Sequence, residues 1–185
     1  MKLNVLMVSG FRIHIDDGSD FWKLADSVAD LPNVTVTDRT WDSDDPSGLQ
    51  DSDLAGRDVI LCYSWGVASV FKAFDRLTKA GTMPDRIPLL VIMAGVPRGI
   101  GQCLEVALGG GWKVPAAVTE AVCLQVDSFP VSYPIANSEP ERVNILITGI
   151  PGNDHVGIQD FQSAHDIILN LIASAACACA QKAAA

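Results

Sequence analysis

The chain has 185 residues and a mass of 19.7 kDa, which is enough for one domain with a single sizeable core. Hydrophobic residues make up 49% of the sequence and charged residues 19%, proportions that exclude an intrinsically disordered chain. The formal net charge is −9 and the pI is near 4.6, without a basic stripe anywhere in the sequence. This charge excludes nucleic acid as a partner and makes an anionic membrane surface an equally poor one.

Apolar runs bounded by turn residues predict six strands. In chain order they cover residues 3–8, 34–37, 59–63, 89–94, 121–126 and 143–148. Apolar residues at three- and four-residue steps predict three helices, which begin at Ser19 or Asp20, directly after Ser64, and at Gly157. We expect a polar loop over 40–53 and an irregular, glycine-rich segment over 99–115.

The strands and helices alternate along the chain, which predicts the α/β class. Runs such as LLVIMA and VILCY are apolar without alternation, as is typical of strands covered on both faces. The expected architecture is a three-layer sandwich around a mostly parallel six-stranded sheet. We expect one domain over 1–176, followed by an Ala-rich C-terminal tail over 177–185.

The compartment is predicted from three features of the sequence. Five cysteines without a CxxC spacing do not form a disulfide framework. The first apolar run is interrupted by Asn4 and lacks a cleavage site for a signal peptide. Apolar runs shorter than about 18 residues predict no membrane span. We therefore expect a cytoplasmic protein, whose oligomeric state the sequence leaves open.

A serine stands between the third predicted strand and its helix, in the sequence Cys62-Tyr63-Ser64-Trp65-Gly66. A sharp strand-to-helix turn lifts the central hydroxyl over the edge of the sheet, and small residues two positions before and after it relieve the crowding. Gly66 is small, and so is Cys62. Ser64 is therefore a candidate nucleophile, and the alternative is an ordinary helix cap.

A serine nucleophile needs an imidazole as its base and a carboxylate that orients the imidazole. His155 follows the last predicted strand and Asp127 follows the strand before it. Because the carboxyl ends of parallel strands share one sheet edge, we expect Ser64, Asp127 and His155 to meet there. Asp154 is a second candidate for the acid, although the side chains of chain neighbours diverge. Cys62 is disfavoured as nucleophile because it lies inside a buried strand.

These residues resemble the α/β-hydrolase superfamily, whose nucleophile stands in a Gly-x-Ser-x-Gly turn and whose triad runs Ser, Asp, His along the chain. The chain departs from this pattern at Cys62, where the family has glycine. The resemblance covers essentially the whole chain and is greatest to small members, the cutinases and minimal lipases. It implies a minimal α/β-hydrolase fold and a lipase-like serine esterase that forms an acyl-enzyme on Ser64 without a cofactor.

The resemblance also implies an oxyanion hole and a substrate pocket. The expected oxyanion donors are the backbone N–H groups of Phe11 and Trp65, although the family's His-Gly-Gly-Gly run is absent. The segment 95–119 is expected to form an apolar flap over the pocket. Side chains expected to line the pocket, with plain core packing as the alternative for each, are Tyr63, Trp65, Trp112, Phe129 and Val131.

The expected partner is a small-molecule ester, by default one with a short or medium acyl chain, although Arg12 and Arg98 follow strands and could hold one anion. The same catalytic residues would cleave amides and thioesters, and the sequence does not separate these substrates from esters. We expect no metal site. A second hypothesis is a catalytically inert hydrolase-fold module for binding or structure, which the departure at Cys62 favours. A third, a flavodoxin-like nucleotide binder, lacks the phosphate-binding loop that it needs after the first strand.

Overall fold

The computed structural model describes residues 2–10, 19–42, 44–127, 132–136, 139, 141–148, 150 and 154–184. Six strands form one sheet in the order β2-β1-β3-β4-β5-β6, and every neighbouring pair is parallel. The strands are β1 (Leu3–Val8), β2 (Val34–Arg39), β3 (Val59–Tyr63), β4 (Ile87–Met93), β5 (Val118–Val126) and β6 (Arg142–Ile147). The predicted α/β class with a six-stranded parallel sheet is confirmed.

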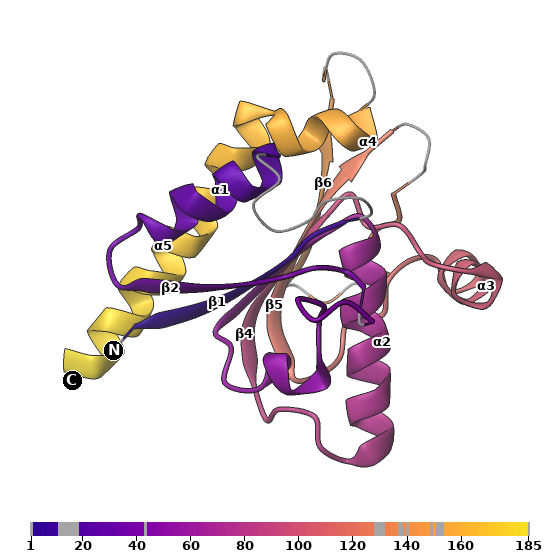
Figure 1. Ribbon diagram of the computed structural model, residues 1–185, viewed down its shortest axis with the longest axis horizontal. Coiled ribbons are helices and arrows are strands. Elements are labelled where there is room, and N and C mark those ends of the chain that lie inside the picture. The colour runs from indigo at the N-terminus through magenta and orange to yellow at the C-terminus, as the bar shows by residue number, and fades with distance from the viewer. Residues whose placement is uncertain are drawn as a thin grey trace.

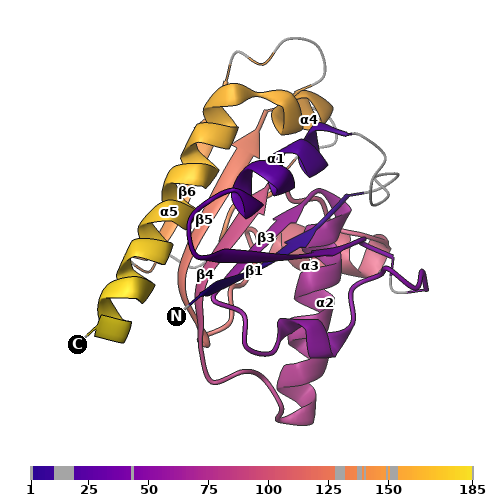
Figure 2. The ribbon, with the colours of Figure 1, turned by 60° about the vertical axis from the view of Figure 1, so that its left-hand side comes forward.

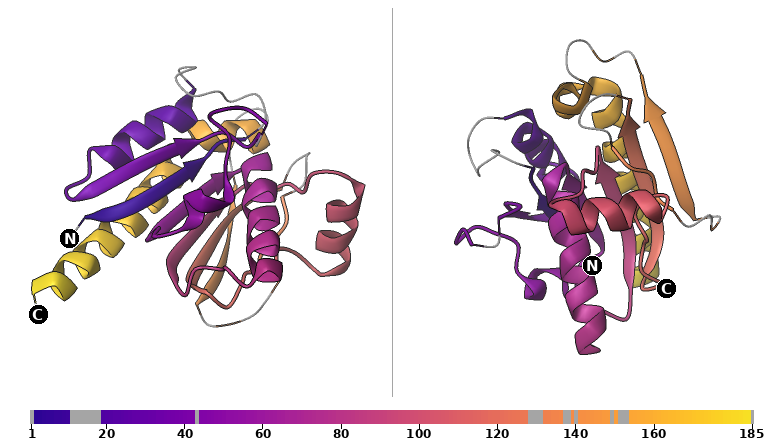
Figure 3. Two further views of the ribbon diagram at one scale, coloured as in Figure 1. Left: turned by 60° about the horizontal axis from the view of Figure 1, so that its bottom comes forward. Right: turned by 90° about the vertical axis from the view of Figure 1, so that its right-hand side faces the viewer.

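Helices cover both faces of this sheet, so the fold has three layers. Helices α1 (Asp20–Ala29) and α5 (Gln162–Ala184) lie on one face, and α2 (Trp65–Ala80) lies on the other (Figures 1 and 2). Helix α3 (Ile100–Leu108) stands beside α2, away from the sheet (Figure 3). The short elements are η1 (Asp51–Leu54), α4 (Asp154–Gly157) and η2 (Ile158–Asp160).

The sheet separates two hydrophobic cores, because successive side chains of a strand point to opposite faces. Leu61 and Tyr63 of β3 belong to the core under α1 and α5. Ile60 and Cys62 of the same strand belong to the core under α2. All four side chains are at most 3% exposed, which explains why the run VILCY is apolar without alternation.

Two of the predicted helical assignments are wrong. The segment expected to be irregular contains α3, whose apolar residues Ile100, Leu104 and Leu108 lie at helical spacing but are 81%, 56% and 86% exposed. The flanking glycines obscured this helix in the sequence. The last long helix begins at Gln162 and not at Gly157, because α4 and η2 precede it.

Helix α5 continues through Ala184, so the expected tail from residue 177 is helical in the described part of the chain. By length and composition alone, the stretch Gln162–Gln181 is apolar enough to cross a membrane, and 22% of it is buried. One such helix is weak evidence, since core helices pass the same test. The predictions of a cytoplasmic protein and of no membrane span stay predictions.

Candidate functional site

Ser64 lies at the turn from β3 into α2, in a backbone conformation that side chains rarely adopt. Its φ is 53° and its ψ is −120°. Hydrogen bonds hold the turn on both sides of the residue. The Ser64 N–H donates to the Met93 carbonyl over 3.0 Å, and its own carbonyl accepts from Val67 and Val96 over 3.2 and 3.3 Å. The strain is therefore imposed by the sheet and the helix together.

Two glycines make room for this turn. A Cβ atom at Gly66 would lie 2.5 Å from the Ser9 carbonyl oxygen, so no larger residue fits between α2 and the end of β1. A Cβ atom at Gly10 would lie 2.7 Å from the Cβ of Ser64 itself. Cys62 stands where the Gly-x-Ser-x-Gly pattern has glycine, fully buried, with its thiol 3.6 Å from the Val91 carbonyl oxygen. Burial raises the pKa of this thiol well above its ordinary value, so Cys62 is no thiolate nucleophile.

The turn lies where ligands bind in open α/β sheets. From β1 the chain crosses to β2 on one side and later to β3 on the other, so the strand order reverses between β1 and β3. At such a switch point the loops after the two strands separate and leave a crevice at the carboxyl edge. Ser64 follows β3, and Gly10 follows β1 close by.

His155 reaches Ser64 from a distant part of the chain. It is the second residue of α4, and its Nε2 atom lies 2.9 Å from the Oγ of Ser64. Both residues are 6% exposed. The distance is that of a hydrogen bond, in which a neutral imidazole with Nε2 unprotonated accepts the serine proton. The structure therefore brings together two of the three predicted catalytic residues.

Burial sets the charge of this histidine. It lowers the pKa of His155 to about 4 from an ordinary value of 6.5, because the buried ring disfavours its charged form. At neutral pH the imidazole is therefore uncharged, the form that a general base requires. The same burial makes it a weak base until a negative charge develops nearby.

Asp127, the predicted acid, lies directly after β5 and is exposed. Among the described residues no hydrogen bond or ion pair joins Asp127 to His155. Asp154 is the first residue of α4, and its side chain lies outside what the structure describes. The identity of the acid thus stays a prediction.

Of the two predicted oxyanion donors, Trp65 lies among the described residues and Phe11 does not. Trp65 is the first residue of the 16-residue helix α2, so its backbone N–H lies at the positive end of the helix dipole, directly after Ser64. Phe11 lies outside the described residues, and so does Arg12.

The described members of the predicted pocket, Tyr63, Trp65 and Trp112, lie in different surroundings. The prediction of Tyr63 as a pocket residue is wrong. Its side chain is 3% exposed and packs in the core under α1. Successive side chains of β3 point to opposite faces of the sheet, and that of Tyr63 points away from α2. Trp65 is half-buried, with its ring 5.2 Å from that of Trp41. Phe129 and Val131 lie outside the described residues.

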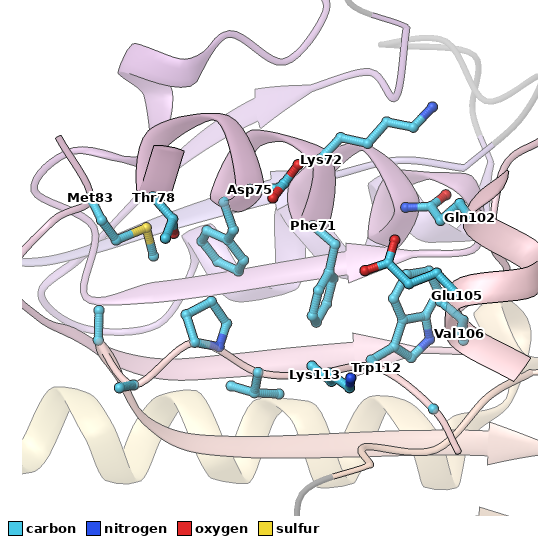
Figure 4. Close-up of a pocket in the computed structure, with 16 residues that line it drawn as sticks. Phe71, Lys72, Asp75, Thr78, Met83, Gln102, Glu105, Val106, Trp112 and Lys113 are labelled. Atoms are coloured by element: carbon cyan, nitrogen blue, oxygen red, sulfur yellow. The ribbon is translucent and has the colours of Figure 1, made fainter. Parts of the chain in front are cut away.

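Trp112 is also wrong as a wall of a pocket over Ser64. It is 1% exposed and packs against Phe71, with ring centroids 4.8 Å apart. It lines a cavity of about 740 Å³ between α2, α3 and the segment after α3 (Figure 4). Neither Ser64 nor His155 lines this cavity. Its apolar lining includes Phe71, Phe74, Met83, Val106, Trp112 and Val114.

Sequence reasoning missed one feature beside the serine. The guanidinium of Arg98 lies over the ring of Trp41, with 4.2 Å from Cζ to the ring centroid, and 5.7 Å from the centroid of Trp65. The position of Arg98 after a strand was a signal, but nothing in the sequence brings Trp41 to it. Within the described ranges no group of three His, Cys, Asp or Glu residues could hold a metal ion.

Comparison with known proteins leaves these observations as the basis for function. No family model matches the chain, and no curated protein matches it.

Proposed function

We propose that the chain is a serine hydrolase of the α/β-hydrolase class that cleaves carboxylic esters. One observation carries the proposal: a serine hydroxyl in a strained strand-to-helix turn lies 2.9 Å from the Nε2 atom of a buried histidine that comes from another part of the chain. An ordinary helix cap needs neither the positive φ nor the imidazole. Ser64 has a positive φ and the imidazole of His155 as its partner, and it lies at the switch point of the sheet.

The chemistry follows from these two side chains. As the Ser64 Oγ attacks the ester carbonyl carbon, its proton passes to Nε2 of His155. The carbonyl oxygen becomes an anion near the N-terminus of α2, where the Trp65 amide is the expected donor. His155 then gives its proton to the leaving alkoxide, and the acyl group stays on Ser64. His155 then takes a proton from water as the water oxygen attacks the acyl carbon. The bond from this carbon to the Ser64 Oγ breaks, the carboxylic acid leaves, and His155 returns the proton to Ser64.

A fluorophosphonate probe tests the proposal because it labels only an activated serine. The proteins to compare are the wild type, Ser64→Ala and Ser27→Ala. Ser27 is the matched control, since it is an exposed serine of α1 whose hydroxyl donates only to the Lys23 carbonyl over 2.9 Å. We expect the wild type and Ser27→Ala to be labelled and Ser64→Ala to remain unlabelled. Hydrolysis of 4-nitrophenyl esters should follow the same pattern.

Two outcomes contradict the proposal. If none of the three proteins is labelled or hydrolyses an ester, the inert binding module is favoured. If Ser64→Ala is labelled as fast as the wild type, the reactive group is another residue.

A further inference from the structure

Arg98 differs from the other arginines that the structure describes. Each of the others donates side-chain hydrogen bonds to protein oxygen atoms; these are Arg39, Arg57, Arg76, Arg86 and Arg142. The guanidinium of Arg98 has no hydrogen bond or ion pair in the described part of the chain, and it lies over the rings of Trp41 and Trp65.

The backbone beside this cation is fixed. The N–H of Arg98 donates to Oε1 of Gln102 over 2.7 Å, and Nε2 of Gln102 donates to the Ala68 carbonyl over 3.2 Å. Two residues earlier, the Val96 N–H donates to the carbonyl of Ser64. The loop after β4 is thereby tied to the first turns of α2.

The aromatic partner Trp41 is tied to the same helix. The hydroxyl of Ser69 in α2 donates to the Trp41 carbonyl over 2.6 Å. The rings of Trp41 and Trp65 meet edge to face, with centroids 5.2 Å apart and planes at 76°. The two rings and the guanidinium therefore form one cluster, which we call the Arg98 cluster (Trp41, Trp65 and Arg98).

The cluster is joined to the turn of the candidate nucleophile by the backbone: Trp65 directly follows Ser64, and Val96, two residues before Arg98, donates its N–H to the Ser64 carbonyl. Stacking on aromatic faces holds a guanidinium while leaving the N–H donors in its plane available. These donors form a planar fork that matches a carboxylate in two parallel hydrogen bonds. A single guanidinium balances one negative charge, which suits a carboxylate better than a doubly charged phosphate.

We infer that the Arg98 cluster binds a carboxylate carried by the substrate, so that the preferred esters are anionic. This inference rests on the proposed function, since it concerns the substrate of the Ser64 site. It replaces the default expectation of a neutral acyl ester with a half-ester, in which one carboxyl group is esterified and cleaved and the other is free.

Two matched pairs of esters test the inference by their ratio of kcat/KM. For a carboxylate in the acyl part, 4-nitrophenyl hemiglutarate is compared with 4-nitrophenyl valerate, which has a methyl group in place of the carboxylate. For a carboxylate in the alcohol part, 4-carboxyphenyl butyrate is compared with 4-acetylphenyl butyrate. The wild type should prefer the anionic ester in at least one pair, and added salt should weaken the preference.

Variants at Arg98 should then remove the preference. In Arg98→Gln the anionic-to-neutral ratio should fall by about tenfold or more, as expected for lost charged hydrogen bonds. Arg98→Lys keeps the charge but not the fork, and should give an intermediate ratio. Arg86→Gln is the matched control, because Arg86 precedes β4 at the opposite edge of the sheet. An anionic-to-neutral ratio that is the same in the wild type and both Arg98 variants overturns the inference.

A binding measurement separates this inference from the proposed function. Monomethyl glutarate is titrated into Ser64→Ala, with tryptophan fluorescence as the readout, since Trp41 and Trp65 contact the guanidinium. Saturable binding that Arg98→Gln weakens by about tenfold supports the carboxylate site even if no ester is hydrolysed. If neutral esters are hydrolysed but the anion is neither bound nor preferred, the proposed hydrolase function stands and the carboxylate site at the Arg98 cluster is overturned.

Discussion

Tyr63 holds the backbone of His155. Its hydroxyl donates to the His155 carbonyl oxygen over 2.8 Å, and the two rings are stacked with centroids 5.8 Å apart. Phe21 stacks on Tyr63 at the same spacing. Because Tyr63 directly precedes Ser64, two consecutive residues contact the histidine: Tyr63 contacts its backbone and its ring, and Ser64 contacts its ring. Tyr63 is therefore a positioning residue for the candidate base.

Removing the hydroxyl of Tyr63 should affect catalysis more than binding. In Tyr63→Phe the ring packing remains, but the hydrogen bond from the Tyr63 hydroxyl to the His155 carbonyl is lost, which should cost about 1 kcal/mol of stability. With the histidine less well fixed, kcat should fall about tenfold and KM should change little. Ester kinetics and urea unfolding measure both effects. Tyr133→Phe, at the other tyrosine of the chain, should change neither, and a KM effect alone in Tyr63→Phe would contradict the positioning role.

The close approach of Gly10 to Ser64 predicts a sensitive position. In Gly10→Ala the new Cβ atom would lie 2.7 Å from the Cβ of Ser64, so the turn or the loop after β1 must shift. We expect ester hydrolysis to fall at least tenfold, because displacements of about 1 Å have such effects. Gly101→Ala is the control, since its Cβ atom meets nothing within 4 Å and alanine favours helix α3. Equal activity of the two variants would show that the turn tolerates the methyl group.

The sequence predicted the meeting of Ser64 and His155 for a general reason. The carboxyl ends of parallel strands share one sheet edge, so residues that follow β3 and β6 can approach each other despite 91 positions of separation. The same rule assigned Asp127 to that edge, but it cannot say which way an exposed side chain points. The direction of a side chain after a strand depends on loop contacts that the sequence does not encode locally.

Tyr63 and Trp112 show what else could not be predicted. A strand buried on both faces has no alternation in its sequence, so the face toward which Tyr63 points cannot be read from VILCY. Trp112 follows glycines, which suggested a flap, yet it packs on Phe71 of α2, a contact between segments about 40 positions apart. The Arg98 cluster likewise depends on three segments that only the fold brings together.

The acid of the proposed triad is open to a direct comparison. If Asp127 orients His155, Asp127→Asn should lower kcat by about a hundredfold or more, because an amide favours the wrong tautomer of the imidazole. Asp154→Asn should then have a much smaller effect. Ester hydrolysis is measured for both variants, and KM is expected to stay the same in each. An equal loss in the two, or a larger one in Asp154→Asn, would overturn the assignment to Asp127.

The strain at Ser64 predicts an unusual order of stability. At φ 53° and ψ −120°, glycine is relaxed and alanine is strained, so Ser64→Gly should be more stable than Ser64→Ala by about 1 kcal/mol. At Ser27, inside α1, the order should reverse, because glycine costs a helix about 0.5–1 kcal/mol relative to alanine. Urea unfolding of the four variants measures both differences. The same order at both positions would contradict the strain.

The buried His155 should make stability depend on pH. Its pKa is lowered to about 4 in the folded protein and is near 6.5 in the unfolded chain, so the unfolded chain binds the proton more readily. The folded state is unaffected above 6.5 and loses stability as the pH falls from 6.5 toward 4. Between pH 7 and pH 5 the expected loss from this group is about 2 kcal/mol. In His155→Gln this loss is absent, so the difference between the variant and the wild type in urea unfolding at the two pH values isolates it. Equal losses in both proteins would mean that the imidazole is not held neutral by burial.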